Sequence, residues 1–254
     1  MSLLEIHGLS LRFGGVRALQ DVEMEVDGGT IHGLIGPNGA GKTTLLNCIG
    51  RVIRPQEGRI RFDGVDLLDR ATHELAGLGI ARTFQNLALM NERSVLDNVM
   101  VGLPEQSRGF DMSAFLPTYG RAAKERASRA RAHDALALLE LDGHAEKPVR
   151  GLPYGHRKSI EIARALCASP RMLMLDEPTA GLNSAEMDRP AQVVTRLRSE
   201  LDLTILLITH HIEFLLQVAD RVTVLDLGRV LADGAPQIVQ TDPEVRAAYL
   251  GVDE

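Results

Sequence analysis

The sequence predicts an α/β fold in which a largely parallel β-sheet is flanked by helices. An antiparallel β edge is expected at the N-terminus, and a helical sub-domain is expected within the core. Strand-like and helix-like segments alternate on both sides of the middle of the 254-residue chain, which is typical of a parallel sheet covered by helices. Residues 3–26 show strand patterns only, whereas residues 86–150 are rich in alanine, leucine and arginine at helical spacing.

The composition is that of a globular protein, with 44% hydrophobic and 24% charged residues. The net charge of -6 offers no basic field for nucleic acid, so no nucleic-acid partner is expected. No segment approaches the roughly 18 to 20 apolar residues that cross a bilayer, and Met1 to Arg12 lack the pattern of a secretory signal. We therefore expect a cytosolic chain whose membrane role comes through a partner. Cys48 and Cys167 match no metal-ligand spacing and are interpreted as buried thiols.

The first part of the core is predicted to be mostly strands. In chain order the expected elements are strands at Leu3–His7 and Leu9–Phe13, an alternating strand through Val22, Met24 and Val26, a buried strand at Thr30–Ile35, a helix at Lys42–Gly50, and strands at Arg59–Phe62 and Ile80–Phe84. The buried strand runs into a glycine-rich turn, with the helix directly behind it. This order is that of a strand–turn–helix unit.

The second part of the core follows the helical region. The expected elements are a helix at Gly155–Ala168, a strand at Met172–Leu175, a helix at Ala185–Glu200, a strand at Leu203–Ile208, and short strands at Arg221–Asp226 and Arg229–Ala232 that turn at Leu227-Gly228. The predicted division is therefore an α/β core formed by residues 1–85 and 156–254, with a helical sub-domain at residues 86–155.

The turn after the buried strand has the pattern G-x-x-x-x-G-K-[ST] of a phosphate loop. Its residues are Gly36, Pro37, Asn38, Gly39, Ala40, Gly41, Lys42 and Thr43, and Thr44 follows. The glycines allow successive backbone N–H groups to face one anion, and the helix N-terminus adds its positive end. Lys42 is expected to hold the β- and γ-phosphates of ATP, and the Thr43 hydroxyl to bind Mg²⁺. The alternative is a glycine turn that only caps a helix. A chance match in a chain of this length has a probability of about one in a hundred, which favours the phosphate loop.

Two adjacent acids end the apolar strand at Met172–Leu175. Such a pair is costly to bury unless a ligand or solvent uses it, and the carboxyl edge of a parallel sheet faces the ligand crevice. We expect Asp176 to orient the Mg²⁺ shell and Glu177 to polarise the attacking water. A solvated strand-end pair is the alternative, and the phosphate loop makes it the less favoured one.

With these two motifs the chain resembles the ATP-binding subunits of ABC transporters, nearly from end to end. Further matching segments are Thr83-Phe84-Gln85-Asn86 for the Q-loop, Leu152-Pro153-Tyr154-Gly155-His156 for the signature motif, Ile160 to Leu166 behind it, Ala180-Gly181-Leu182-Asn183 for the D-loop, and Leu206 to His210 for the switch-histidine strand. The resemblance implies a RecA-like P-loop core with ATP and Mg²⁺ as ligands.

Within this family the branch of branched-chain amino-acid importers is the most similar. The resembling segments are Arg12-Phe13-Gly14-Gly15, Gly79 to Asn86, and Ala248-Tyr249-Leu250-Gly251. Importers of urea, amides and other small organic solutes share these segments, so they remain the alternative within the family.

The resemblance also implies roles for single residues. Phe13 would stack on adenine, with a plain core aromatic as the alternative. Gln85 would contact Mg²⁺ and the attacking water and would couple the site to the transmembrane partner. His210 would contact the γ-phosphate, whereas His211 replaces the usual acid and is assigned no role.

The signature motif departs from the family pattern. Its serine, which contacts ATP on the opposing subunit, is Pro153 here, and proline offers neither a hydroxyl nor an N–H group. Tyr154 follows it, Gly155 and the helix N-terminus still favour an anion, and His156 replaces the usual glutamine. The chain's contribution to a neighbour's ATP is thus expected to be weaker.

The predicted function is ATP hydrolysis that drives import through separate transmembrane subunits at the cytoplasmic face of the membrane. Expected partners are a second ATP-binding subunit, expected to be a paralogue, the permease subunits, and indirectly a solute-binding protein. Two alternatives from other classes are a soluble ABC-type ATPase of DNA repair, translation or cluster assembly, and a nucleotide-binding regulator without turnover. The absence of a long coiled-coil insertion or a second core disfavours the first, and Glu177 disfavours the second.

Overall fold

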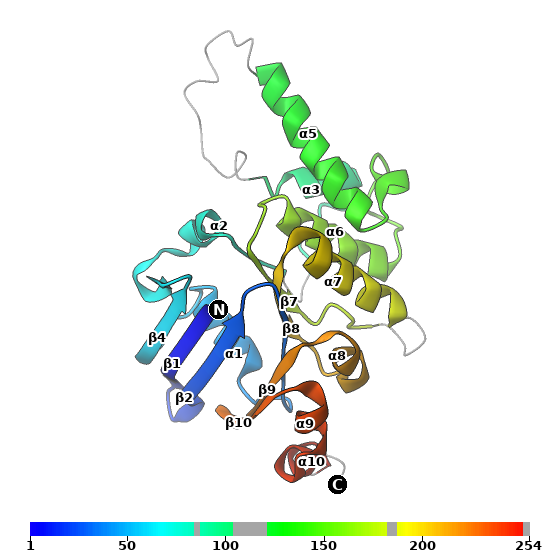
Figure 1. The fold of residues 1–254 in the computed structure, drawn as a ribbon. Helices are drawn as coiled ribbons and strands as arrows, with labels where there is room; N and C mark the ends of the chain where they lie inside the picture. The colour runs from blue at the N-terminus through cyan, green and yellow to red at the C-terminus, as the bar shows by residue number, and fades with distance from the viewer. Residues whose placement is uncertain (84–86, 104–120, 182–186, 251–254) are drawn as a thin grey trace. The chain divides into compact units, whose positions relative to one another are not determined.

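The computed structural model describes residues 1–83, 87–103, 121–181 and 187–250 (Figure 1). The chain divides into two compact units, one formed by Met1–Arg82 with Arg171–Glu254 and the other by Thr83–Pro170. The second unit extends beyond the sub-domain predicted at 86–155, because helix α6 runs without a break from Tyr154 to Leu166. The assignment of residues 1–85 and 156–254 to ATP binding and of residues 86–155 to a separate sub-domain stays a prediction.

The expected antiparallel edge at the N-terminus is confirmed. A four-stranded sheet has the order β2-β1-β4-β5, with β1 at Ser2–Phe13, β2 at Val16–Asp27, β4 at Glu57–Phe62 and β5 at Val65–Asp66. The two strands predicted at Leu3–His7 and Leu9–Phe13 form one continuous strand. Gly8 joins them with a φ of 60°, where the register with both neighbouring strands shifts.

The second sheet has six strands in the order β10-β9-β3-β8-β7-β6. Its strands are β3 (Ile31–Ile35), β6 (Ile80–Arg82), β7 (Met172–Asp176), β8 (Thr204–Ile208), β9 (Arg221–Asp226) and β10 (Arg229–Gly234). All pairs are parallel except β9–β10, which is the predicted hairpin with its turn at Leu227 and Gly228. The largely parallel sheet is therefore confirmed. Phe84, the predicted end of β6, lies outside the described residues.

The first unit also contains several helices. They are α1 (Lys42–Ile49), α2 (Leu75–Leu78), α7 (Asp188–Leu201), α8 (Ile212–Val218), α9 (Pro236–Thr241) and α10 (Pro243–Leu250), with short 3-10 turns η1 (Leu67–Asp69) and η2 (Thr72–Glu74). Of these helices, α2, α8, α9 and α10 contact the six-stranded sheet. The helices predicted at Lys42–Gly50 and Ala185–Glu200 are confirmed, although Ala185 and Glu186 lie outside the described residues. Helices α8, α9 and α10 were not predicted from the sequence.

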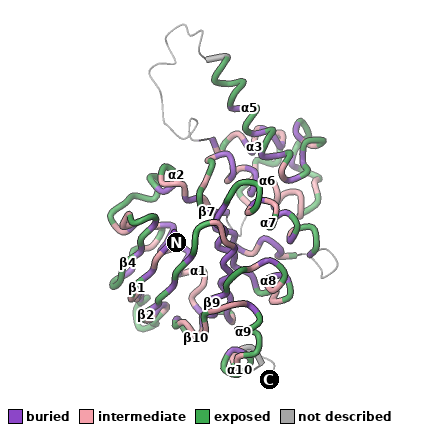
Figure 2. Tube along the Cα trace, viewed as in Figure 1, coloured by how far each residue is buried: buried purple, intermediate pink, exposed green. Residues whose placement is uncertain are grey.

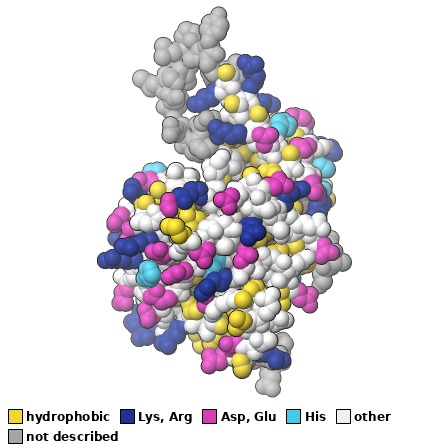
Figure 3. Space-filling view, viewed as in Figure 1, with side chains coloured by type: hydrophobic (Ala, Val, Ile, Leu, Met, Phe, Trp, Pro, Cys, Tyr) yellow, Lys and Arg dark blue, Asp and Glu magenta, His cyan; other side chains and the backbone are white. Residues whose placement is uncertain are grey.

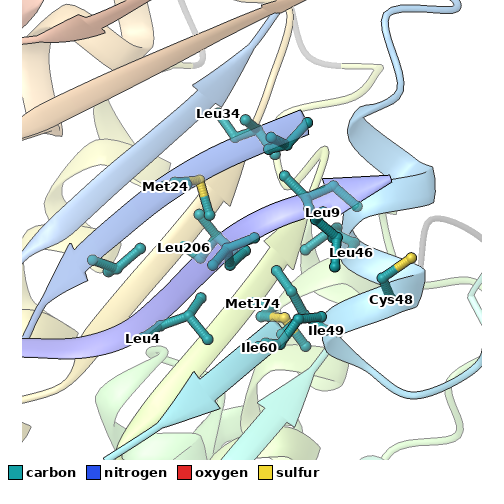
Figure 4. Packing of buried hydrophobic residues seen from close by; sticks show 14 of the residues in the cluster. Leu4, Leu9, Met24, Leu34, Leu46, Cys48, Ile49, Ile60, Met174 and Leu206 are labelled. Carbon is teal, nitrogen blue, oxygen red and sulfur yellow. The ribbon is translucent and has the colours of Figure 1, made fainter. Parts of the chain in front are cut away.

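One hydrophobic core joins the two sheets and α1. Leu4 and Leu9 from β1 meet Leu34 from β3, Leu46 from α1 and Leu206 from β8, and the exposed fraction of each is 0% (Figure 4). Burying each such side chain contributes about 1.5 to 3 kcal/mol. Figure 2 shows the same pattern along the trace, with buried residues running through the central strands. This core holds the strand before the phosphate loop in a fixed position.

The second unit consists of α3 (Val95–Met100), α5 (Arg121–Leu138), the 3-10 turn η4 (Asp142–His144) and α6, and these helices pack on one another. Its helices agree with the helical spacing of alanine, leucine and arginine in residues 86–150. Arg164 of α6 donates to the backbone carbonyls of Asn98 at 3.0 Å and Ala88 at 2.9 Å. Among the described residues no helix is long and apolar enough to cross a membrane.

Candidate functional site

The predicted phosphate loop lies between β3 and α1, and its path requires glycine. Gly36 has a φ of 152°, and a Cβ atom there would lie 2.1 Å from the Leu225 carbonyl oxygen. Gly41 has a φ of 104°, and its Cβ would lie 2.6 Å from the Ala18 carbonyl oxygen. Any side chain at either position would collide with backbone, so both glycines are needed for this turn.

The outer part of the loop is tied to the hairpin of β9 and β10. The Gly228 N–H donates to the Ala40 carbonyl at 3.0 Å, and the Gln20 N–H donates to the Gly228 carbonyl at 2.7 Å. Asn38 and Gly39 remain exposed. The loop is thus held from behind while its open side faces solvent.

Lys42 bends back over this loop. Its Nζ donates to the carbonyls of Gly36 at 2.6 Å and Pro37 at 2.9 Å. Burial lowers the pKa of Lys42, and the nearby carboxylates of Glu177 and Asp176 oppose this shift. The ammonium group of Lys42 therefore lies against the loop backbone, where phosphate oxygens would need a counter-charge.

Helix α1 begins directly after the loop, and Gly41 gives it no side-chain cap. The N–H groups of its first turn are therefore free of a capping side chain, as an anion site requires. Thr43 in this turn is exposed, and Thr44 is partly buried.

The acid pair lies at the carboxyl end of β7, as predicted. Asp176 is 4% exposed, and its Oδ2 accepts a hydrogen bond from Nη2 of Arg82 at 3.1 Å. Nη1 of the same arginine donates to Oδ1 of Asn47 in α1 at 2.7 Å. Arg82 thus links β6, β7 and α1 beneath the phosphate loop. Arg82 was not predicted from the sequence, although an arginine at the end of a buried strand signals a charge that needs a partner.

Glu177 has a strained backbone that aims its side chain. Its φ is 52°, a left-handed conformation that costs a non-glycine residue on the order of 1 to 3 kcal/mol. Its N–H donates to the Ile208 carbonyl at 2.9 Å, which ties it to the end of β8. Nδ1 of His210 lies 2.9 Å from Oε2 of Glu177. The structure therefore brings the two predicted catalytic side chains together.

Thr209 supports the segment that places His210. This threonine is fully buried, and its Oγ1 lies 3.4 Å from Oγ1 of Thr179, which follows the acid pair. The same oxygen accepts a hydrogen bond from the His211 N–H at 3.1 Å. The loops that follow β7 and β8 are thus joined by hydroxyl contacts as well as by His210 and Glu177.

The remaining predicted residues lie elsewhere. Phe13 ends β1 and is 50% exposed, so its ring is accessible rather than part of the core. Gln85 lies outside the described residues, as do Leu182 and Asn183 of the D-loop.

The signature segment belongs to the second unit, where Pro153 is the N-cap of α6 and makes no side-chain cap hydrogen bond. Tyr154 is 45% exposed, and Nζ of Lys158 lies 5.7 Å from the centre of its ring. Gly155 lies in the first turn, and its carbonyl accepts from the Ser159 hydroxyl at 3.2 Å. The ring of His156 lies 5.0 Å from that of His144.

The donor set of the first unit is suited to Mg²⁺. Asp176 supplies a buried carboxylate and Thr43 an exposed hydroxyl at the head of α1. Among the described residues no group of three His, Cys, Asp or Glu side chains could hold a metal ion alone. Mg²⁺ typically binds one or two protein oxygens together with substrate phosphates, so these residues fit that ion.

Known proteins share this chain's sequence and fold. Residues 19–180 match the family described as ABC transporter, and residues 229–254 match the branched-chain amino acid ATP-binding cassette transporter family. The high-affinity branched-chain amino acid transport ATP-binding protein BraF of Pseudomonas aeruginosa is 37% identical over 98% of both chains.

Two solved structures extend the comparison. The ADP conformation of MJ1267, an ATP-binding cassette of an ABC transporter, is 31% identical over 99% of both chains, with a TM-score of 0.87. The dimeric post-hydrolysis state of the cassette MJ0796, bound to ADP and Pi, is 26% identical over 92% of this chain and 98% of its own, with a TM-score of 0.75. The RecA-like P-loop core is thus the fold of this protein, and the chain belongs to the ABC transporter ATP-binding family.

Proposed function

We propose that this chain hydrolyses ATP to drive the import of branched-chain amino acids through separate transmembrane subunits. Glu177 beside His210, in the same unit as the phosphate loop, is the observation that carries the hydrolysis. The full-length similarity to BraF and the match of residues 229–254 favour branched-chain amino acids as the solute.

Lys42 is the first residue that ATP would displace. Its Nζ now bonds to the carbonyls of Gly36 and Pro37, and the β- and γ-phosphates would offer it stronger, charge-assisted acceptors. The loop N–H groups and the first turn of α1 would bind the same phosphates. Phe13, exposed at the end of β1, would stack on the adenine ring.

Hydrolysis then depends on the two residues at the ends of β7 and β8. Glu177 would accept a proton from the attacking water, and His210 would contact the γ-phosphate while it holds the Glu177 carboxylate in place. Thr43, Asp176 and Gln85 would hold Mg²⁺, which neutralises phosphate charge when it is bound. Arg82 would act as a positioning residue through its bond to Asp176.

The assembly that we propose contains a second ATP-binding subunit, permease subunits and, indirectly, a solute-binding protein. The chain would lie at the cytoplasmic face of the membrane. The segment around Gln85 and residues 86–150 would form the docking surface for the permease, because Gln85 is expected to couple the site to that partner and residues 86–150 contain no nucleotide-binding motif of their own. Cross-linking that places the permease only against residues 203–254 would contradict this.

Transport is tested by reconstitution. The chain is co-purified with its membrane subunits and placed in vesicles with the solute-binding protein, and ATP-dependent uptake of leucine is compared with uptake of urea and acetamide. Leucine uptake that stops with Glu177→Gln supports the proposal. Uptake of urea or an amide alone would favour the alternative within the family. An active ATPase that co-purifies with no membrane subunit would favour a soluble ABC-type ATPase.

A further inference from the structure

A pocket of about 260 Å³ lies in the first unit, behind β3 and β9 and under the C-terminal helices. Its apolar lining includes Ile35 of β3, Leu215 of α8, Val222 of β9, Val239 of α9 and Val245 of α10. Figure 1 shows α8, α9 and α10 beside β9 at the C-terminal end of the chain. None of the residues predicted for ATP binding lines this pocket.

The walls of the pocket are held by close packing. Gly33 lets α8 approach β3, since a Cβ there would lie 2.4 Å from Cδ1 of Leu215. Oδ1 of Asp242 caps α10 by accepting from the N–H groups of Glu244 at 2.8 Å and Val245 at 3.3 Å. Val239 and Val245, on either side of this junction, are each 4% exposed. The elements that form these walls are therefore packed against one another.

The lining is mostly apolar, and its two polar residues are Gln240 and the cation Arg246. Arg246 lines the pocket and is exposed, and among the described residues no hydrogen bond or ion pair involves its guanidinium group. A carboxylate is the natural partner of an arginine, which binds it through two parallel hydrogen bonds. Pockets for drug-sized ligands measure about 300 to 1,000 Å³, so this one suits a smaller molecule.

We propose that this pocket binds a small branched aliphatic carboxylate, with its apolar body between α8, α9 and β9 and its carboxylate on Arg246. Five of the ten lining residues lie in the segment 229–254 that matches the branched-chain family, namely Pro236, Val239, Gln240, Val245 and Arg246. Only the identification of the natural ligand as a free branched-chain amino acid rests on the proposed function.

The position of the pocket connects it to the ATP site. Ile35 directly precedes Gly36 of the phosphate loop, and Ile212 of the lining follows His210 by two residues. A bound molecule would therefore contact the residue just before the phosphate loop and the first residue of α8, which begins just after His210.

The experiment is titration calorimetry on the purified full chain with 4-methylpentanoate and with leucine. We expect a dissociation constant of about 0.1 to 1 mM for 4-methylpentanoate, and no binding of 4-methylpentan-1-ol, which lacks the carboxylate. Arg246→Gln should weaken binding about ten- to a hundredfold, because one charge-assisted contact is lost. Arg246→Lys should recover part of the affinity, and Arg59→Gln, an exposed arginine of β4, should change nothing.

A second variant keeps the test independent of charge. Leu216→Phe enlarges a partly buried side chain of the lining and should abolish binding while ATP binding persists, which also reports that the variant is folded. Absence of binding to the wild-type chain, or wild-type affinity in either Arg246→Gln or Leu216→Phe, would overturn the proposal. Neither result bears on leucine uptake by the reconstituted transporter, so the two proposals fail separately.

Discussion

Nδ1 of His210 lies 2.9 Å from Oε2 of Glu177, and this contact joins the ends of two neighbouring parallel strands. The register of β7 and β8 pairs Asp176 with Ile208, so the residues that follow each strand emerge side by side. The side chain of Glu177 is 13% exposed, whereas that of His210 is 59% exposed. A shielded carboxylate beside an accessible imidazole is an arrangement that can both accept a proton and reach a phosphate.

Glu177→Gln should leave ATP bound but slow its hydrolysis by on the order of 10²-fold or more. The substitution keeps the size of the side chain and its contact with His210 while it removes the proton acceptor. Single-turnover hydrolysis and nucleotide affinity, measured on the same preparation, separate the two effects. We expect a trapped ATP-bound dimer, and wild-type turnover would refute the role of Glu177.

Lys42→Ala should weaken ATP binding by roughly ten- to a hundredfold, because one charge-assisted contact to the phosphates is lost. In the ATP-free chain the same change removes two hydrogen bonds to the loop carbonyls of Gly36 and Pro37. Lys147→Ala, which changes an exposed lysine of the other unit, is a suitable control. If equilibrium binding of ATP is the same in wild type and Lys42→Ala, the assignment of the phosphate loop is wrong.

Much of the core could be predicted from the sequence because its signals are local. Strands β3, β7 and β8 are buried along their whole length and appear as unbroken apolar runs. The phosphate loop is likewise a contiguous motif whose glycines are explained by its own backbone. Helices α8 and α9 were missed because they have only seven and six residues, too few to show a helical period.

The arrangement of the site depends on pairings that no local pattern reveals. Arg82 contacts Asp176 only because β6 and β7 are neighbours, with Arg82 opposite Met174. The contact of Glu177 with His210 likewise needs the register of β7 and β8. The sequence supplied the residue types, and the order of the strands brought them together. Figure 3 adds that acidic and basic side chains are interspersed on the face shown, a distribution that composition alone does not give.

Stability should fall on mild acidification because of His32. His32 is 1% exposed, and its Nε2 lies 2.7 Å from Oγ1 of Thr223. This burial lowers the pKa of His32 from 6.5 to about 4, although the Asp233 carboxylate opposes the shift. Between these two pKa values the unfolded chain binds a proton at this site that the folded chain does not. The contribution of neutral His32 to the free energy of unfolding is therefore fully present above pH 6.5. It is lost as the pH falls toward 4, by on the order of 3 kcal/mol at most.

Urea denaturation at pH 7.5 and pH 5 measures this loss. His32→Asn keeps a polar group near Thr223 but cannot titrate, so the variant should lose less free energy of unfolding between the two pH values than the wild type. His73→Asn replaces an exposed histidine and should behave like the wild type. Equal losses in wild type and His32→Asn would contradict the role of His32.

The working assembly should pair this chain with a paralogue, and Pro153 is the reason. In the family's closed dimer each ATP lies between the phosphate loop of one subunit and the signature motif of the other. A homodimer would present Pro153 to both γ-phosphates, and both sites would lack a hydroxyl donor. Losing one charge-assisted hydrogen bond costs about 1.5 to 3 kcal/mol, or roughly a ten- to hundredfold effect on each site.

Pro153→Ser tests this asymmetry in the purified chain alone and in the reconstituted transporter. Pro153 is the N-cap of α6, so serine would also cap the helix and stabilise it by about 1 kcal/mol. Pro153→Ala has neither effect and serves as the control, and thermal unfolding separates stabilisation from catalysis. We expect the serine to raise self-association and turnover of the chain alone, and to act less in the transporter, where a paralogue supplies an intact signature to this chain's ATP. If the wild-type chain already self-associates tightly with brisk turnover, and the serine changes neither preparation, a homodimer suffices and the asymmetry is wrong.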